Sequence, residues 1–121
     1  MSFKIVRANE ATPYVAPKHY QVLPTRLHNP DDVNSGNIIM GLSHFLPGGG
    51  CEYANNAFES IYYIVEGEMD IVVEEGTPEE VRTTLHAGDS FHCGPGTNKG
   101  IENHGISTCK MLAIMVNPEA K

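Results

Sequence analysis

Residues 88–103 read GDSFHCGPGTNKGIEN, and this stretch decides the fold. Two short extended runs flank a Gly-Pro-Gly turn, which predicts two strands joined by a tight connection. In the second run the side chains alternate, so Lys99, Ile101 and Asn103 share one face. Two interpretations of Lys99 follow: either it stands inside a closed sheet as a buried amine, or it is an ordinary cation on a solvated face.

The remaining sequence predicts further strands. Short β-prone runs separated by Gly and Pro turns occur at residues 61–65, 69–74, 81–85 and 108–116. Prolines break residues 1–36 into short edge strands and loops, and no long segment shows a helical period. The fold class is therefore all-β, of the sandwich or barrel type.

The stretch from residue 37 to residue 46 is apolar, and one alternation carries Met40, Leu42 and His44 on the same face. We predict that this face lines a pocket. The alternatives are a histidine satisfied within the core and a strand of the opposite phase. Glycines at 48–50 are expected to end the strand, with irregular chain over 51–60.

Composition limits the possible partners and location. The net charge is -7, and the eight Lys and Arg residues are scattered singly, so the chain offers no basic stripe for nucleic acid. The first 20 residues contain no uninterrupted apolar run, so neither a signal peptide nor a membrane partner is expected. Three cysteines without a C-x-x-C pair indicate reduced thiols, and we predict a cytoplasmic protein.

The spacing of residues 88–103 resembles the second signature of the cupin family, written G-x5-P-x-G-x2-H-x3-N. It falls on Gly88, Gly94, Gly96, Lys99 and Asn103 with every spacing kept, although Gly94 replaces the proline and Lys99 replaces the histidine. The resemblance covers residues 37–116 and implies a cupin-type jelly-roll β-barrel, also called a double-stranded β-helix. We therefore expect one domain, with N-terminal edge strands and loops at 1–36, the barrel at 37–116 and a loose tail at 117–121.

The family's first signature, G-x5-H-x-H-x3-4-E-x6-G, has lost its metal-binding side chains here. With three residues in the variable gap it falls on Gly48, Ala54, Asn56, Ser60 and Gly67, and with four the histidine positions become Tyr53 and Asn55. An ammonium group at the fourth ligand position would repel a cation about 4 Å away by roughly 4 kcal/mol per unit charge at an effective dielectric of 20. We expect no ordinary metal and no cofactor. An unconventional site of His44, Glu59 and His92 remains the alternative.

The cupin register places a set of polar side chains around Lys99. The candidate catalytic residues are Lys99, Tyr62, His44 and Glu59, and the candidate substrate-binding residues are Tyr53, Asn55, Asn56, Ser60, Met40, Leu42, His92 and Asn103. A lysine can donate a proton, hold a carboxylate or enolate by its charge, or form an imine with a carbonyl. Either Tyr62 or Tyr53 is then the complementary acid, His44 the base and Glu59 the group that keeps Lys99 charged.

Two classes of function stay open. The first is a metal-independent lyase, isomerase or decarboxylase that acts on a small carboxylated or carbonyl compound, similar to the metal-free sugar epimerases among the cupins. The second is a non-catalytic cupin that binds a small anion or serves as a structural or regulatory subunit. A cupin enzyme with the unconventional metal site is a further alternative.

The strand at 61–65 is apolar on both faces. Ile61, Tyr63 and Val65 lie opposite the face of Ser60 and Tyr62, so they need a cover. Another subunit or the N-terminal segment can supply it. Because many cupins pair through such surfaces, we predict a homodimer.

Overall fold

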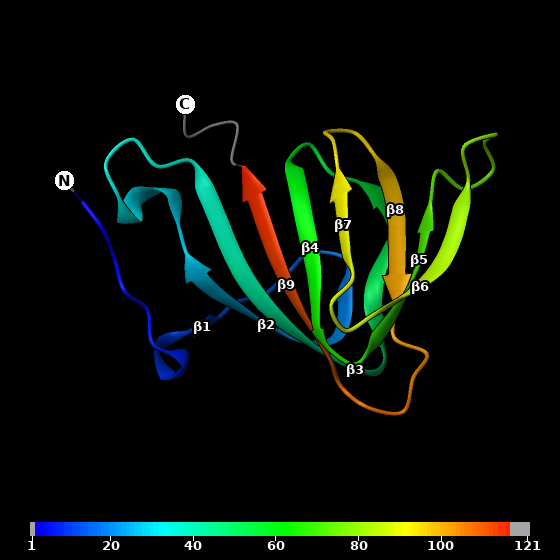
Figure 1. Ribbon diagram of the computed structural model, residues 1–121, viewed down its shortest axis with the longest axis horizontal. Helices are drawn as coiled ribbons and strands as arrows, with labels where there is room; N and C mark the ends of the chain where they lie inside the picture. The colour runs from blue at the N-terminus through cyan, green and yellow to red at the C-terminus, as the bar shows by residue number, and fades with distance from the viewer. Residues whose placement is uncertain (1, 117–121) are drawn as a thin grey trace.

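The computed structural model describes residues 2–116 and is built almost entirely of strands (Figure 1). The strands are β1 (Thr12–Pro13), β2 (His19–His28), β3 (Ile38–Asn55), β4 (Glu59–Glu66), β5 (Glu68–Val73), β6 (Val81–His86), β7 (Ser90–Cys93), β8 (Asn98–Glu102) and β9 (Cys109–Val116). Two short 3-10 helices, Ala8–Glu10 and Pro30–Asp32, complete the elements. The all-β prediction is confirmed. The tail predicted to be loose, 117–121, lies outside the described residues.

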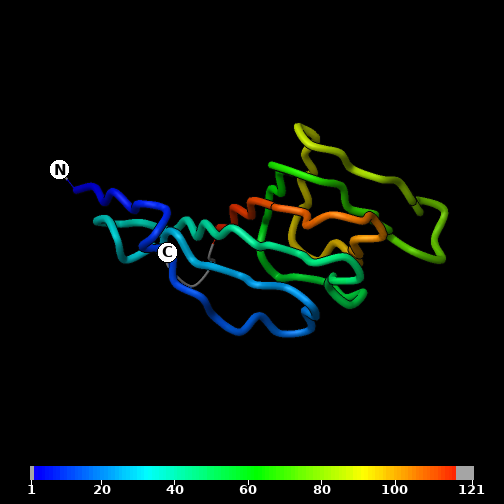
Figure 2. Tube along the Cα trace, turned by 90° about the horizontal axis from the view of Figure 1, so that it is seen from below, coloured from blue at the N-terminus to red at the C-terminus, as the bar shows by residue number. Residues whose placement is uncertain are grey.

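The strands form one antiparallel sheet that curls into a nearly closed barrel. The order along the sheet is β6-β5-β8-β3-β9-β4-β7, and β2 pairs with β3 along its length and with β1 on its far edge. Figure 2 shows the barrel on one side, with the N-terminal residues and the start of β3 reaching away from it. Neither helix in the described part of the chain has the length and hydropathy needed to cross a membrane.

Strand β3 does not end at its glycines, as the sequence had indicated, but bends and continues to Asn55. A Cβ atom on Gly49 would lie 2.2 Å from the carbonyl oxygen of Gln21, and one on Gly50 would lie 2.2 Å from that of Ile101. Only glycine fits so close to neighbouring backbone. The glycines therefore allow β3 to pass between β2 and β8, and the expected break with irregular chain after it was wrong.

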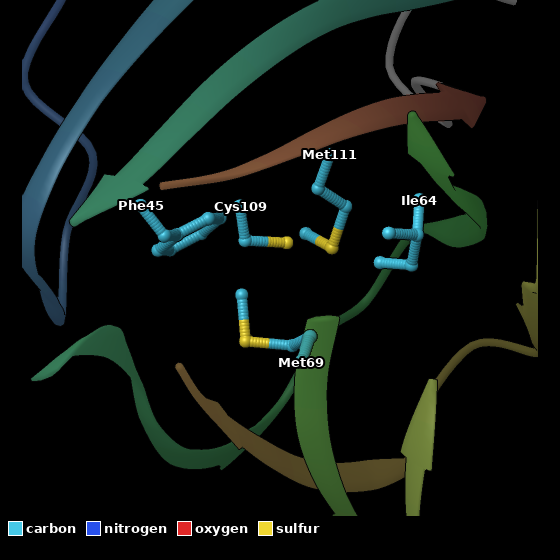
Figure 3. Close-up of a cluster of buried hydrophobic side chains, with 5 residues drawn as sticks. All are labelled: Phe45, Ile64, Met69, Cys109 and Met111. Atoms are coloured by element: carbon cyan, nitrogen blue, oxygen red, sulfur yellow. The ribbon is translucent and has the colours of Figure 1, made fainter. Parts of the chain in front are cut away.

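The hydrophobic core fills one end of the barrel (Figure 3). It consists of Phe45, Ile64, Met69, Cys109 and Met111, each at most 5% exposed. Full burial of a side chain such as Phe45 or Ile64 contributes about 1.5–3 kcal/mol. The same burial raises the pKa of the Cys109 thiol to about 11. Because β9 starts at Cys109 in this core, its later residues run toward the opposite, open end.

The phase predicted for residues 40–46 was wrong. Phe45 is fully buried in the core, so His44 points to the outer face, where it pairs in register with Lys110. Leu42 lies opposite Leu112 on the same outer face, and Met40 shares it. Hydrophobicity did not separate the faces because both are apolar here, with Ile39 and Phe45 inside.

The outer face of β4 is apolar, as the sequence predicted. Ile61, Tyr63 and Val65 are 41%, 44% and 48% exposed, so the chain's own N-terminal strands leave them half uncovered. Ile61 and Tyr63 lie beside Ile114 and Leu112 of β9, which extends the apolar area across the sheet. The homodimer remains a prediction that this surface motivates.

Candidate functional site

A cavity of about 430 Å³ occupies the open end of the barrel. Its walls come from β2, β3, β4, β8 and β9 together with the segment before β2. Met111 of β9 belongs both to the core and to the cavity wall, so the cavity begins where the core ends. This size and enclosure suit a small organic molecule.

Lys99 points into this cavity, so the interpretation of an interior amine is the correct one. It lies opposite Ala54 of β3, and its ammonium nitrogen is 4.9 Å from the centre of the Tyr62 ring. The Tyr62 ring in turn stacks on Phe91 with 6.3 Å between centroids. Burial raises the pKa of the Cys93 thiol, and the positive charge of Lys99 partly offsets that rise. A cation over a tyrosine face is attracted by the ring quadrupole, which holds the ammonium in place.

The positions that correspond to metal ligands in the cupin resemblance do not suit a metal ion here. Tyr53 lies in a groove outside the barrel, which selects the register with Ala54, Asn56 and Ser60. The Asn56 side-chain oxygen accepts a hydrogen bond from the Phe58 backbone at 2.9 Å, and the Ser60 hydroxyl, 1% exposed, donates to the Phe58 carbonyl. A methyl, an amide, a hydroxyl and an ammonium form no divalent-cation site.

Among the predicted substrate contacts, Asn55 and Asn56 line the cavity, as does the predicted catalytic Tyr62. Ser60 is buried beside Cys93, its partner in register across β4 and β7. Asn55 and Asn56 lie near Lys99 because the end of β3 pairs with the start of β8, with Ala54 opposite Lys99 and Asn55 opposite Asn98. The structure therefore assembles part of the predicted set.

Glu59 and His92 lie outside the barrel, so their predicted place in the pocket was wrong. The His92 Nε2 atom is 2.8 Å from a Glu59 carboxylate oxygen, and both side chains are more than half exposed. Each is adjacent in sequence to an inward residue, Ser60 or Cys93, and alternation turns it outward. Within residues 2–116 no three His, Cys, Asp or Glu side chains are placed to hold a metal ion, so His44 does not join them in the hypothesised site.

Asn103 holds the structure together through its side-chain amide. It is fully buried; its amide nitrogen donates to the carbonyl oxygens of Phe45 at 3.1 Å and Ser107 at 2.9 Å, and its oxygen accepts from the Gly105 backbone at 2.9 Å. These three bonds occupy both N–H donors of the amide group and one acceptor site on its oxygen. Asn103 is therefore a structural residue and does not line the cavity.

Sequence reasoning missed His19 and Arg26 of β2, which also line the cavity. The His19 ring stacks against Phe45, and its Nδ1 atom is 2.7 Å from the Pro17 carbonyl oxygen. A carbonyl only accepts, so Nδ1 carries the hydrogen and Nε2 of the neutral ring is the acceptor. Alternation alone would place these two residues on opposite faces, because they are seven positions apart; the irregularity between Tyr20 and Val22 shifts the phase and brings both inward, and no local pattern marks it.

The cavity carries positive charge in an acidic protein. Its charged lining residues are Lys18, Arg26 and Lys99 against a single carboxylate, Glu52, whereas the whole chain has a net charge of -7. The lysine and arginine ion pairs found within residues 2–116 involve other cations, which are Lys4, Arg82 and Lys110. The electrostatics of the cavity therefore favour an anion.

A second hollow of about 540 Å³ lies on the outer face of the sheet formed by β3, β5, β6 and β8. Here Asp70 stands opposite Glu102 across β5 and β8, and His104 contacts both carboxylates, with its Nδ1 atom 2.5 Å from Asp70. Tyr20 donates to Glu102 at 2.6 Å, and Thr84 donates to Asp70 at 2.5 Å. We call this hollow the outer groove. Tyr53 also lines it.

Hydrogen bonds shift the pKa values of the titratable side chains in the outer groove. The Thr84 and His104 bonds lower the pKa of Asp70, and the Tyr20 bond lowers that of Glu102. The bond to Asp70 raises the pKa of His104, and the bond to Glu102 raises the pKa of Tyr20 to about 12. No local motif marks these residues, since they are brought together by cross-strand register.

Comparisons with known proteins place the chain among cupins. The family model described as a cupin domain matches residues 41–115. A protein of Mycobacterium tuberculosis named beta-D-galactosidase is 30% identical over 118 residues, which cover 98% of this chain and 97% of that protein.

Two solved structures share the architecture. A cupin 2 conserved barrel domain protein from Salinispora arenicola matches with a TM-score of 0.76 at 18% identity, covering 99% of this chain and 93% of that one. The polyketide cyclase RemF from Streptomyces resistomycificus matches with a TM-score of 0.77 at 18% identity, covering 94% of this chain and 79% of that one. At such identities the likeness shows the fold.

Proposed function

The chain belongs to the cupin domain family, and from that premise we propose that its barrel cavity binds a small carboxylate or keto acid and transforms it by acid–base chemistry. One observation carries the proposal: three cations and one carboxylate line the cavity of a chain whose net charge is -7. The excess of positive charge attracts an anion into a partly enclosed space, where its attraction to Lys99 is stronger than in water.

Lys99 and His19 have different roles in the proposed reaction. Lys99, held over the Tyr62 ring, anchors the carboxylate or stabilises the negative charge of an enolate oxygen as it develops. The Nε2 atom of His19 is the available base, since Nδ1 is committed to the Pro17 carbonyl. The reaction class is that of a lyase, isomerase or decarboxylase. A protein that binds the anion without transforming it is the non-catalytic alternative.

The test compares two lysines. We would measure dissociation constants for small carboxylates and keto acids with wild type, Lys99→Met and Lys110→Met, since Lys110 is an outward lysine paired with Glu66. Lys99→Met should weaken binding more than tenfold, about 1.4 kcal/mol, while Lys110→Met should leave it unchanged. Equal affinities in all three proteins would remove Lys99 from the site. Turnover of a bound compound separates the enzyme from the non-catalytic alternative.

Hydrolysis of a galactoside in the outer groove is the second candidate. The relative that is 30% identical over 98% of this chain is named beta-D-galactosidase. Glycoside hydrolysis ordinarily uses two carboxyl groups on either side of the bond, and Asp70 and Glu102 face each other in the groove. However, both carboxyl groups have lowered pKa values, so neither is an acid at neutral pH, and His104 becomes the proton donor. This departure ranks the candidate second.

A chromogenic β-galactoside separates the two candidates. If the groove hydrolyses it, Asp70→Asn and Glu102→Gln should each reduce the rate more than a hundredfold, while Lys99→Met retains it. If only Lys99→Met loses hydrolytic activity, the reaction takes place in the cavity and not in the outer groove. A wild-type protein without activity on the compound would remove the candidate.

A further inference from the structure

Four residues lie in one row across the sheet, and three of them, Arg26, Ala113 and Tyr62, line the cavity. Arg26 of β2 pairs in register with Gly41 of β3, Gly41 with Ala113 of β9, and Ala113 with Tyr62 of β4. Neighbouring strands are about 4.8 Å apart, so the three steps separate the backbones of Arg26 and Tyr62 by roughly 14 Å along the curved sheet. Between the two ends, the Ala113 methyl group lines the cavity, whereas Gly41 lies close to β2, since a Cβ atom there would be 2.9 Å from the Thr25 carbonyl oxygen.

Each end of this row carries a cation. At the Tyr62 end, the Lys99 ammonium lies 4.9 Å from the ring centre. At the other end the Arg26 guanidinium carbon lies 4.6 Å from the centre of the Tyr14 ring. Both cations line the same cavity, and both are held against an aromatic face rather than by a carboxylate.

The Arg26 guanidinium lacks one hydrogen-bond partner. Its Nη1 atom donates to Asn29 at 3.0 Å, but its Nε atom is buried and has no acceptor among the described residues. A buried donor without an acceptor is unusual in a folded protein. A carboxylate that approaches the guanidinium side-on supplies that acceptor once the groups that cover Nε move aside. A charge-assisted contact of this kind is directional, because the guanidinium is planar.

Building on the proposed function, we infer that the ligand is an organic dianion. One anionic group meets Lys99, the other meets the Nε edge of Arg26, and the carbon skeleton crosses Ala113. A dicarboxylate of three to six carbons is the chemical class that the row fits. Arg26 is thus a specificity-determining residue: it selects a second anionic group, whereas Lys99 anchors the first.

The experiment measures binding by calorimetry for the dicarboxylates from malonate to adipate, each against its half-amide, which has one charge. Wild type should prefer one dicarboxylate over its half-amide by at least tenfold. Arg26→Met should abolish that preference, because it lowers the affinity for the dicarboxylate far more than the affinity for its half-amide. Arg82→Met serves as the control, because Arg82 is exposed and paired with Glu75 and Glu80, and it should retain the preference.

The outcomes separate this inference from the proposed function. A wild type that binds half-amides and dicarboxylates equally, or an Arg26→Met protein that keeps the preference, overturns the inference while the Lys99 effect still supports the proposed function. A wild type that binds none of the compounds overturns the inference, while the proposed function is decided separately by the binding of other small carboxylates and keto acids. If circular dichroism shows that Arg26→Met does not fold, Arg26→Lys replaces it, and an unchanged preference in that protein overturns the side-on contact.

Discussion

The ammonium nitrogen of Lys99 lies 4.9 Å from the centre of the Tyr62 ring, within the barrel. A cation over an aromatic face is attracted without the hydrogen-bond geometry of an ion pair, so its donors remain available to a ligand. The two residues come from β8 and β4, which are not neighbours in the sheet, and they meet because the barrel curls. This contact places a free charge where the family resemblance places a histidine.

Replacing that charge should not harm the fold. Lys99→Met keeps most of the stem that packs in the barrel and removes an ammonium from a partly desolvated site. None of the ion pairs within residues 2–116 involves Lys99, so the change leaves none of those carboxylates unpaired. We expect a melting temperature equal to or higher than that of wild type, measured by circular dichroism. Tyr62→Phe is the matched control, since it preserves the ring under the ammonium. A fall of many degrees in Lys99→Met would mean that the ammonium is structural.

Asn103 should matter far more for stability than its neighbours in the predicted site. Asn103→Ala removes one hydrogen bond each from the carbonyls of Phe45 and Ser107 and from the Gly105 amide, and we expect a loss of about 2–4 kcal/mol in the free energy of unfolding. Urea denaturation measures this loss. Asn55→Ala, at an exposed position, should change stability by less than about 0.5 kcal/mol. Similar losses for both variants would contradict the structural role of Asn103.

The sequence was sufficient to predict the barrel and the strand that carries Lys99. Glycine and turn spacing in residues 88–103 defined that strand, but alternation showed only that Lys99, Ile101 and Asn103 share a face, and the cupin resemblance was needed to place Lys99 in the pocket. Spacing within one strand is local information, so it can be read without the fold. The same reasoning identified the outward face of Ile61 and Tyr63.

The site features that the sequence did not predict depend on which residues lie next to each other on neighbouring strands. His44 was assigned to the wrong face because both faces of β3 are apolar, and Arg26 was missed because β2 contains Pro24 in a segment that resembled loops. The Asp70–Glu102 pair exists only through the register of β5 against β8. Such contacts follow from the closure of the sheet, which no local pattern encodes.

The outer apolar face should form the interface of a homodimer. Tyr63 is 44% exposed and stands beside Leu112, so burying this face against a second copy removes apolar surface from water. We expect wild type to be dimeric by light scattering, and Tyr63→Lys to shift it to monomers because a charge would be buried. Val81→Lys, on the edge strand β6, is the control and should stay dimeric. A wild-type monomer at every concentration would refute the prediction.

The His104 cluster should make stability depend on pH in a definite direction. Its hydrogen bond to Asp70 raises the pKa of His104 above the ordinary 6.5, so its contribution is complete below pH 6.5 and is lost as the pH rises through the folded-state pKa. The lowered pKa of Asp70 acts in the opposite sense, since its contribution is present above its ordinary value of 3.8 and is lost on acidification. Stabilisation by the pair is therefore greatest between these limits.

Melting temperatures of wild type and His104→Gln across pH 5 to 9 test this dependence. The wild type should exceed His104→Gln by the largest margin near pH 5 to 6, and the two should converge toward pH 9 as His104 loses its proton. His86→Gln is the matched control. His86 is also an exposed histidine near carboxylates, but it does not contact Asp70 or Glu102, the two partners of His104. Because both positions are exposed, salt should reduce the margin as well. A constant difference across the whole range would show that His104 does not carry its charge in this contact.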